Sequence, residues 1–122
     1  MQGAMKLIFV AAPSRAIAVN GKVQDFFIKK VAELNDTNPG FVFISPMIHD
    51  YPVSEFMQDE PTWENWRKRC LTVLRVCDAM VVVTYDDWME AQGVIGEIEF
   101  AKEHLKAVFY VQPEKTLRLT QR

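Results

Sequence analysis

The sequence predicts an α/β protein, a flavodoxin-like three-layer sandwich built on a parallel sheet of four or five strands. Two observations predict this class. Short continuous apolar runs alternate along the chain with longer segments of helical periodicity. These apolar runs also lack the polar alternation of a strand with one solvated face, so helices are expected to cover both faces of the sheet. Right-handed crossovers leave few topologies, and of these we expect the doubly wound sheet.

The first half of the chain supplies two of the expected strands. Residues 6–11 (KLIFVA) form a short apolar run that ends before Pro13, and residues 41–44 (FVFI) form a second run that ends at Ser45-Pro46. Between them a helix is expected from about Val19 to Leu34, followed by the turn cluster 35–40 (NDTNPG). The apolar side chains of this helix recur at steps of three and four on its core side: Val23, Phe26, Phe27, Val31 and Leu34.

The second half begins with a segment, 47–60, in which no period persists. We expect a surface loop there, long enough to serve a function. Asp59-Glu60-Pro61 predicts a helix start. The helix should carry one apolar face, formed by Trp63, Trp66, Cys70, Val73, Leu74 and Cys77.

A third strand is expected at 80–84 (MVVVT), a third helix from about Gln92 to His104, and a last buried strand at 107–111 (AVFYV). The third helix should turn a set of apolar residues inward: Val94, Ile98, Ala101 and Leu105. The polar tail, 113–122, is expected either to fray or to dock on a partner.

Composition excludes several classes of function. A chain of 122 residues suits one domain, 1–122, and the net charge of -2 gives no electrostatic footprint for a nucleic acid polymer or a membrane surface. No apolar run approaches the ~20 residues of a membrane span. Residues 10–12 belong to a strand and not to a secretory signal, so a cytoplasmic protein is expected. Met5 offers a second start, which makes residues 1–4 a possible extension.

The sequence also predicts neither a metal nor a cofactor. Cys70 and Cys77 lie seven residues apart on one expected helix, a rise of about 10 Å that is too long for a disulfide. No histidine or further cysteine clusters with them, so we interpret both as core thiols in a reducing compartment. The glycine patterns of nicotinamide dinucleotide and P-loop sites are absent from the sequence.

Glu97 is the first candidate for chemistry. It follows Gly93 by four residues near the start of a helix that succeeds a buried strand, which places it at the edge of the crevice where open parallel sheets bind ligands. Helical side chains lean toward the amino terminus, so the carboxylate is aimed at this crevice. The helix dipole there favours the ionised form, which suits a nucleophile. The alternative is an ordinary surface carboxylate that stabilises the first turn by ~0.3–1 kcal/mol.

Four blocks of the chain resemble the nucleoside 2-deoxyribosyltransferase family. FVAAPS is similar to the family's first strand and turn, and FVFISPMIH to its second strand with an F-S-P-x-x-H ending. TWENWRKRCLTVLRVCDAMVVV resembles the tryptophan-bearing helix that leads to a C-D-A strand. DDWMEAQGVIGEIEFAKEH, the most specific block, matches G-W-x-x-S-x-G-V-x-x-E-I-x-x-A, and the family's nucleophilic glutamate falls on Glu97.

The resemblance implies cleavage or transfer of the N-glycosidic bond of 2-deoxyribonucleosides or their 5′-monophosphates, with Glu97 attacking the anomeric carbon. Asp86, Asp87 and Glu90 are candidates to protonate the leaving base. Trp88 is expected either to stack on the base or to cover the edge of the core. The expected substrate-binding residues are Ala12, Pro13, Ser14, Arg15, Ser45, His49, Asp86, Trp88 and Gly93.

Three departures from the family pattern support an alternative. The turn 13–15 (PSR) lacks the family's tyrosine, Cys70 stands where an aspartate is common, and Ala91 stands where a serine or aspartate holds phosphate or sugar. Arg15 resembles an arginine of the nucleotide N-glycosidase branch. The alternative is a nucleotide-binding or sensing protein with weakened catalysis, and a third possibility is a structural homo-oligomer.

The family's pockets are completed by a neighbouring subunit, so the resemblance also implies a homodimer or higher homo-oligomer. Residues 47–60 or the tail beyond Gln112 are expected to reach toward the partner's cleft.

Overall fold

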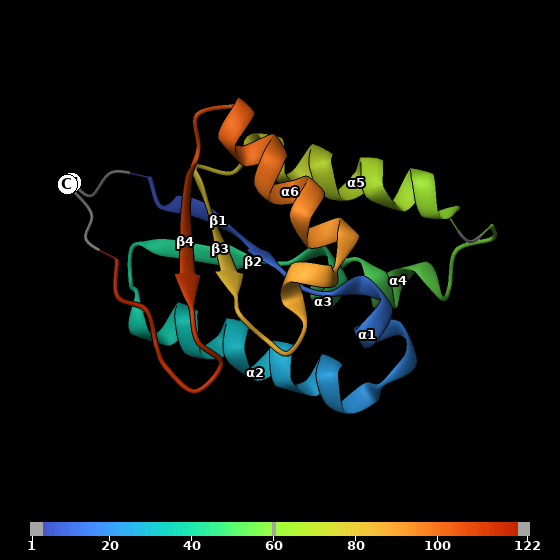
Figure 1. The fold of residues 1–122 in the computed structure, drawn as a ribbon, viewed down its shortest axis with the longest axis horizontal. Coiled ribbons are helices and arrows are strands. Elements are labelled where there is room, and N and C mark those ends of the chain that lie inside the picture. The colour runs from blue at the N-terminus through green and yellow to red at the C-terminus, as the bar shows by residue number, and fades with distance from the viewer. Residues whose placement is uncertain (1–3, 60, 120–122) are drawn as a thin grey trace.

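The computed structural model describes residues 4–59 and 61–119, and within them it contains a four-stranded sheet whose strands all run parallel. The order is β2-β1-β3-β4, with β1 at Lys6–Ala11, β2 at Phe41–Ile44, β3 at Ala79–Val83 and β4 at Ala107–Val111 (Figure 1). The expected α/β class and doubly wound sheet are confirmed. Most of the expected extension 1–4 lies outside the described residues.

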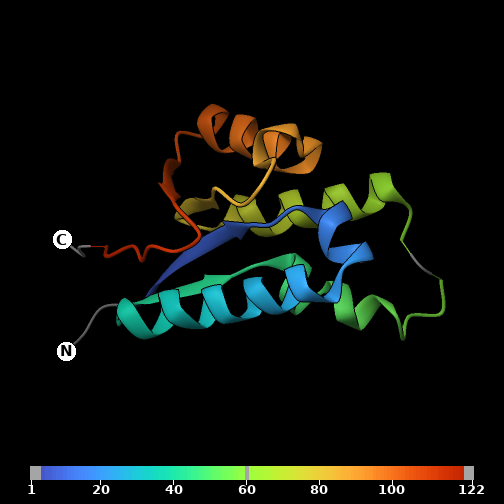
Figure 2. The same ribbon diagram turned by 60° about the horizontal axis from the view of Figure 1, so that its bottom comes forward.

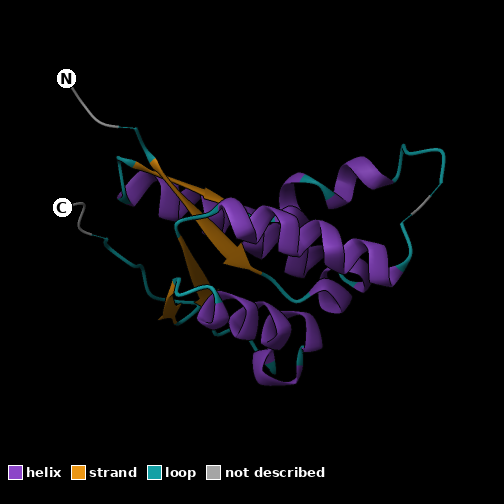
Figure 3. Ribbon diagram, turned by 90° about the horizontal axis from the view of Figure 1, so that it is seen from above, coloured by secondary structure: helices purple, strands orange, loops and turns teal. Residues whose placement is uncertain are grey.

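Helices cover both faces of this sheet. The long helix α2 (Gly21–Thr37) lies on one face, and α5 (Trp63–Val76) and α6 (Gln92–Glu103) lie together on the other (Figures 2 and 3). Side chains cap two of these helices: the Asn20 side chain accepts from the Lys22 N–H at the start of α2, and Thr62 accepts from the Asn65 N–H at the start of α5.

The core lies on the two central strands, β1 and β3. Every residue of β3 is buried, as are residues 8–11 of β1. Large side chains that are wholly enclosed come from these two strands, from β2 and from the helices on either side: Phe9, Phe27, Phe43, Leu34, Leu74 and Met80.

Two expectations about the last strand and helix are wrong. β4 is an edge strand, so Phe109 and Tyr110 remain 36% and 47% exposed instead of buried. Leu105 is 94% exposed because α6 ends at Glu103 and Leu105 takes the left-handed conformation (φ 57°) that closes it. The Lys106 N–H donates to Ala101 O and the Leu105 N–H to Lys102 O, the bonds of a Schellman motif.

The segment expected as an aperiodic loop is mostly helical in its described part. It forms two short helices, α3 (Pro46–His49) and α4 (Tyr51–Ser54), and Met47 is buried. Another short helix, α1 (Ser14–Val19), precedes α2 and was not expected. Helices this short carry too few turns to show a period in the sequence. The helix expected from residue 59 begins at Trp63, and it ends at Val76, before Cys77.

The described part of the tail packs on its own chain. The Asn38 side chain donates to Leu117 O at 2.8 Å and accepts from the Leu119 N–H at 2.6 Å. Lys30 Nζ donates to Pro113 O at 3.1 Å and also to Lys115 O. The tail up to residue 119 therefore packs against α2 and its C-cap, Asn38, and is not frayed.

None of the helices in residues 4–59 and 61–119 combines the length and the apolar composition that crossing a bilayer requires.

Candidate functional site

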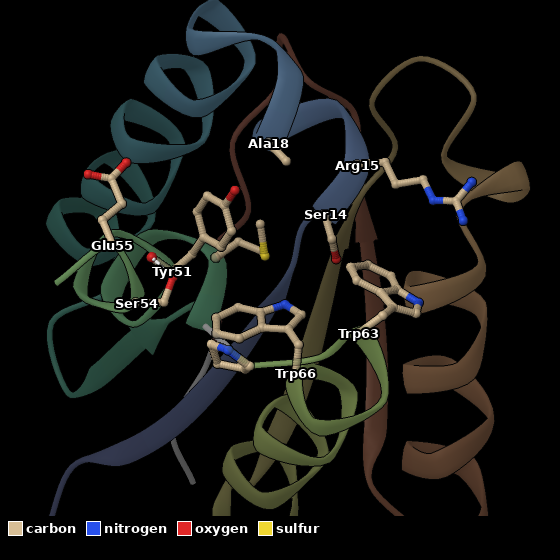
Figure 4. Close-up of a pocket in the computed structure, with 10 residues that line it drawn as sticks. Ser14, Arg15, Ala18, Tyr51, Ser54, Glu55, Trp63 and Trp66 are labelled. Carbon is tan, nitrogen blue, oxygen red and sulfur yellow. Dashed lines mark hydrogen bonds between the residues drawn. The ribbon is translucent and has the colours of Figure 1, made fainter. Parts of the chain in front are cut away.

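Three hollows adjoin one another beyond the carboxyl ends of the strands, and Ser14 and Trp63 border all of them. Figure 4 shows the lining of the largest of the three. Their volumes are about 400, 270 and 50 Å³. The largest, here called the aromatic hollow, is lined by Ser14, Arg15, Ala18, Met47, Tyr51, Ser54, Glu55, Pro61, Trp63 and Trp66. The second, the acidic hollow, is lined by Pro13, Ser14, Arg15, Ala16, Trp63, Asp86, Asp87, Glu90, Ala91, Gln92 and Gly93. The smallest, the Glu97 hollow, is lined by Ser14, Trp63, Trp66, Arg67, Cys70, Gln92, Gly93 and Glu97.

The three hollows meet where α1 and α6 approach each other. Ser14 is the first residue of α1, directly after the turn that ends β1. Its Oγ lies 3.6 Å from the position that a Cβ on Gly93 would occupy, so the start of α6 lies in van der Waals reach of this hydroxyl. The loop after β1 and the helix after β3 therefore form one wall together.

Glu97 is a buried carboxyl in this wall. Its residue is 9% exposed and it lines the Glu97 hollow, yet it forms no hydrogen bond or ion pair with any other described residue. Burial raises its pKa from 4.5 to about 8, and the charge of Arg67 opposes that rise. The expectation of a carboxylate kept ionised by the helix dipole is wrong. Glu97 is the sixth residue of α6, beyond the free N–H groups of the first turn, and desolvation outweighs the dipole.

The aromatic wall opposite is fixed by contacts between α5 and the residues after β2. The rings of Tyr51 and Trp66 meet edge to face with centroids 5.7 Å apart. Beside them Arg69 donates two hydrogen bonds of 2.8 Å to the Asp50 carboxylate. The Trp66 indole nitrogen is buried without a hydrogen-bond partner in the described residues, and it faces the space between Tyr51 and Trp63 (Figure 4). A ligand acceptor in this hollow would satisfy the N–H.

Cys70 lies behind this wall. Burial, followed by the nearby Glu97 carboxyl, raises the pKa of the Cys70 thiol far above its usual value. The thiol is therefore neutral. No group of three or more metal-ligating side chains gathers anywhere in the described residues, and Cys70 and Cys77 are free and buried.

The acidic hollow brings three carboxyls, Asp86, Asp87 and Glu90, opposite one arginine, Arg15. The carboxyls come from the loop after β3, where Asp87 takes a left-handed backbone conformation (φ 58°) just before the 3₁₀ turn η1 (Trp88–Glu90). In Figure 4 the Arg15 side chain is directed away from Tyr51 and Trp66. This hollow therefore has the opposite character to the aromatic one.

Of the residues expected at the site, the structure brings Pro13, Ser14, Arg15, Asp86, Gly93 and Glu97 to the lining of the hollows. Ser45, His49, Trp88 and Ala12 do not line them. His49 Nδ1 lies 3.1 and 3.0 Å from the main-chain N and O of Ser45, and Ser45 itself is 1% exposed. Trp88 packs on Tyr110 at the sheet edge, with ring centroids 5.7 Å apart, and Ala12 is buried.

Sequence reasoning missed Tyr51, Trp63, Trp66 and Arg67 as lining residues. Trp63 and Trp66 were interpreted as one core face, but Trp63 is 52% exposed while Trp66 is 5% exposed. The first turn of α5 extends past the strands (Figure 1), so Trp63 borders the cleft instead of the core, whereas Trp66 belongs to the core and also lines the cleft. The sequence feature that could have indicated this lining is a pair of tryptophans one helical turn apart, directly after a long segment without hydrophobic periodicity.

Comparison with known families matches residues 6–112 to a family described as "Domain of unknown function (DUF1937)". No curated protein matches the chain. A similar solved structure is that of a 2-desoxiribosyltransferase from Leishmania mexicana, with a TM-score of 0.60 and 16% sequence identity. The likeness covers 88% of this chain but 64% of that one, so this chain spans less than two thirds of its neighbour. At this identity the likeness shows a shared fold.

Proposed function

We propose that this chain, which belongs to the family described as a domain of unknown function (DUF1937), cleaves or transfers the N-glycosidic bond of 2-deoxyribonucleosides. The single observation that carries the proposal is Glu97, a buried carboxyl without a hydrogen-bond partner in the described residues, which borders a small hollow between two larger ones. The likeness in fold to a 2-desoxiribosyltransferase supports the same chemistry.

The proposed mechanism has two steps. The Glu97 carboxylate attacks the anomeric carbon through an oxocarbenium-like transition state, the bond from this carbon to the base nitrogen breaks, and a glycosyl ester forms. Water or a second base then attacks the same carbon and frees the carboxylate. Because the nucleophile must be ionised and its pKa in the free protein is about 8, kcat/KM should rise with pH until about pH 8.

The aromatic hollow is the proposed place of the base. Tyr51, Trp63 and Trp66 supply ring surfaces for stacking, and the unpartnered Trp66 N–H supplies a donor for a ring nitrogen or carbonyl of the base. Glu55 is the carboxyl that borders this hollow and is the proposed proton donor for the leaving base. Trp88, the residue first expected to stack on the base, lies outside it.

The acidic hollow is the proposed place of the sugar's 5′ end. Three carboxyls against one guanidinium repel a phosphate dianion, so a 5′-hydroxyl is preferred over a 5′-monophosphate. Ala91, at the cap of α6, has no hydroxyl to offer a phosphate. Of the two substrate classes that the sequence left open, we therefore propose the nucleoside.

The experiment is an incubation of the protein with deoxynucleosides and their monophosphates at pH 6, 7 and 8, with free base measured by chromatography. The proposal expects base release from nucleosides that increases with pH and is lost in Glu97→Gln. Faster release from the monophosphates would overturn the assignment of the acidic hollow.

The second candidate is a nucleotide-binding protein without turnover. The neutral form of Glu97 at pH 7 favours it, because a protonated carboxyl can donate a hydrogen bond but cannot attack. This candidate predicts a rise in melting temperature with added nucleoside or nucleotide and no base release at any pH.

A homodimer is the proposed assembly. The proposed interface is formed by the exposed apolar side chains between α4 and α5, where Phe56 is 88% exposed. Light scattering of the purified protein and of Phe56→Ser tests this, and a monomeric wild type with full activity would contradict it.

A further inference from the structure

Arg67 reaches from α5 onto the backbone of α6. Its Nη2 lies 3.0 Å, and its Cζ 3.5 Å, from the position that a Cβ on Gly96 would occupy. Gly96 is the residue just before Glu97, and Arg67 and Glu97 line the same hollow of about 50 Å³. The guanidinium therefore rests on the bare backbone next to the buried carboxyl.

Arg67 is also the only permanently charged group among the described residues that line this hollow. The other titratable group there is Cys70, which α5 also contributes and whose thiol is neutral. Ser14 from α1 and Gln92 from α6 carry no charge. Among these lining residues, Arg67 is therefore the one whose charge can stabilise the ionised form of Glu97.

We propose that Arg67 is a positioning residue for Glu97: its guanidinium, seated against Gly96, attracts the carboxylate, stabilises the ionised form relative to the protonated one, and orients it for attack. That Glu97 is oriented for attack rests on the proposed function, because the attack on the anomeric carbon is part of that proposal. The attraction itself does not depend on it.

The geometry suits a nucleophile better than a direct ion pair would. Arg69 and Asp50 form such a pair, in which two hydrogen bonds of 2.8 Å occupy both carboxylate oxygens. Arg67 and Glu97 form no ion pair, so the carboxylate oxygens keep their lone pairs for the anomeric carbon. The positive charge of Arg67 still favours the ionised form of Glu97.

Gly96 gives a way to disturb this arrangement without removing a charge. A Cβ only 3.0 Å from Nη2 forces the guanidinium to shift, and the long arginine side chain can do so without disturbing the backbone. Gly96→Ala should therefore weaken the attraction, whereas Arg67→Met should abolish it.

The test is the pKa of the Glu97 carboxyl, measured by NMR titration of protein labelled with ¹³C at the glutamate carboxyls and assigned with Glu97→Gln. We expect this pKa to rise by about one pH unit in Arg67→Met, to rise less in Gly96→Ala, and to return toward the wild-type value in Arg67→Lys. The control is Lys68→Met, which removes the neighbouring positive charge of α5 outside the hollow and should leave the pKa unchanged.

An unchanged pKa in Arg67→Met, or an equal rise in Lys68→Met, would overturn the inference. The titration needs no turnover, so a protein that releases no base would refute the proposed function and leave this result intact. Where turnover is measurable, the rise of kcat/KM with pH should move to higher pH in Arg67→Met by the same interval as the titration, which a purely structural role would not produce.

Discussion

Within residues 4–59 and 61–119, each face of the sheet buries one acidic or basic side chain, and the two side chains differ in their hydrogen-bond partners. On one face Lys30 of α2 is 4% exposed, and on the other Glu97 of α6 is 9% exposed. Lys30 Nζ donates to the main-chain oxygens of Pro113 and Lys115 and forms an ion pair of 2.8 Å with Glu33. Glu97 has no hydrogen-bond partner among the described residues.

The difference indicates what each group is for. A buried charge that uses all its hydrogen bonds stabilises one conformation, and here Lys30 holds the tail against α2. A buried carboxyl without partners destabilises its ionised form and keeps its lone pairs free for a ligand. The face that carries α2 is therefore structural, and the face that carries α5 and α6 is the proposed site of chemistry.

The largest effect that this comparison predicts is on turnover. Glu97→Gln removes the nucleophile while preserving shape, so base release should fall on the order of 10⁴-fold. Chromatography of the released base measures it, and Glu99→Gln, on the solvated side of α6, serves as the matched control. Equal turnover in Glu97→Gln and wild type would show that the carboxyl is not catalytic.

The second effect is on the pH dependence of stability. The folded-state pKa of Glu97, about 8, lies above its ordinary value of 4.5, so the folded state holds this proton more tightly between those pH values. The free energy of unfolding should therefore fall as pH rises through this window, by about 1.4 kcal/mol for each pH unit. Urea denaturation of wild type and Glu97→Gln at several pH values measures the difference, which should grow until about pH 8 and then stay constant. A constant difference between the two proteins would contradict the raised pKa.

The third effect concerns the other face. Lys30→Met keeps the apolar stem but leaves two carbonyls and Glu33 without their donor, so the free energy of unfolding should fall by about 2–3 kcal/mol. Denaturation curves measure the change, with Lys29→Met on the exposed side of α2 as control. Base release per folded molecule should stay the same. A stability equal to wild type would mean that the tail is not held by Lys30.

The smallest predicted effect is on binding. Trp66→Phe removes the buried indole N–H, so the affinity for a nucleoside should fall about tenfold, the equivalent of one hydrogen bond. Calorimetric titration with a nucleoside into the Glu97→Gln background measures binding without turnover. Trp88→Phe, on the sheet edge, is the control, and an equal loss in both variants would argue against the aromatic hollow as the binding place.

The strands and the long helices could be predicted from the sequence because their signals are local. The apolar runs 6–11, 41–44 and 80–84 predict strands that the structure has at Lys6–Ala11, Phe41–Ile44 and Ala79–Val83. Burial is continuous over residues 8–11 and 79–83, whereas Val42 of the edge strand β2 is 36% exposed. Val23, Phe27, Val31 and Leu34 of α2 are buried as their spacing predicts. The exposure of Phe109 could not be predicted in this way, because an apolar run has the same composition whether its strand is central or at the edge of the sheet.

The lining of the cleft could be predicted only in part. Ser14, Gly93 and Glu97 follow strands or lie near the start of helices. Open parallel sheets bind ligands beyond the carboxyl ends of their strands, so these three residues could be predicted at the site. Trp66 and Arg67 lie in the first part of a helix that runs toward its strand, and their place depends on how far α5 extends past the sheet. The protonation of Glu97 likewise depends on which side chains enclose it, and these come from three separate elements.

The measurement that tests the central claim most directly is the mass of the intact protein after incubation with a 2′-fluoro-2′-deoxyarabinonucleoside. Fluorine at C2′ destabilises the oxocarbenium-like transition states, and a glycosyl ester then accumulates. The account predicts an increase by the mass of one fluorinated sugar, located by peptide mapping on Glu97 and absent in Glu97→Gln. Release of free base without an ester on Glu97, or an ester on another residue, would contradict it.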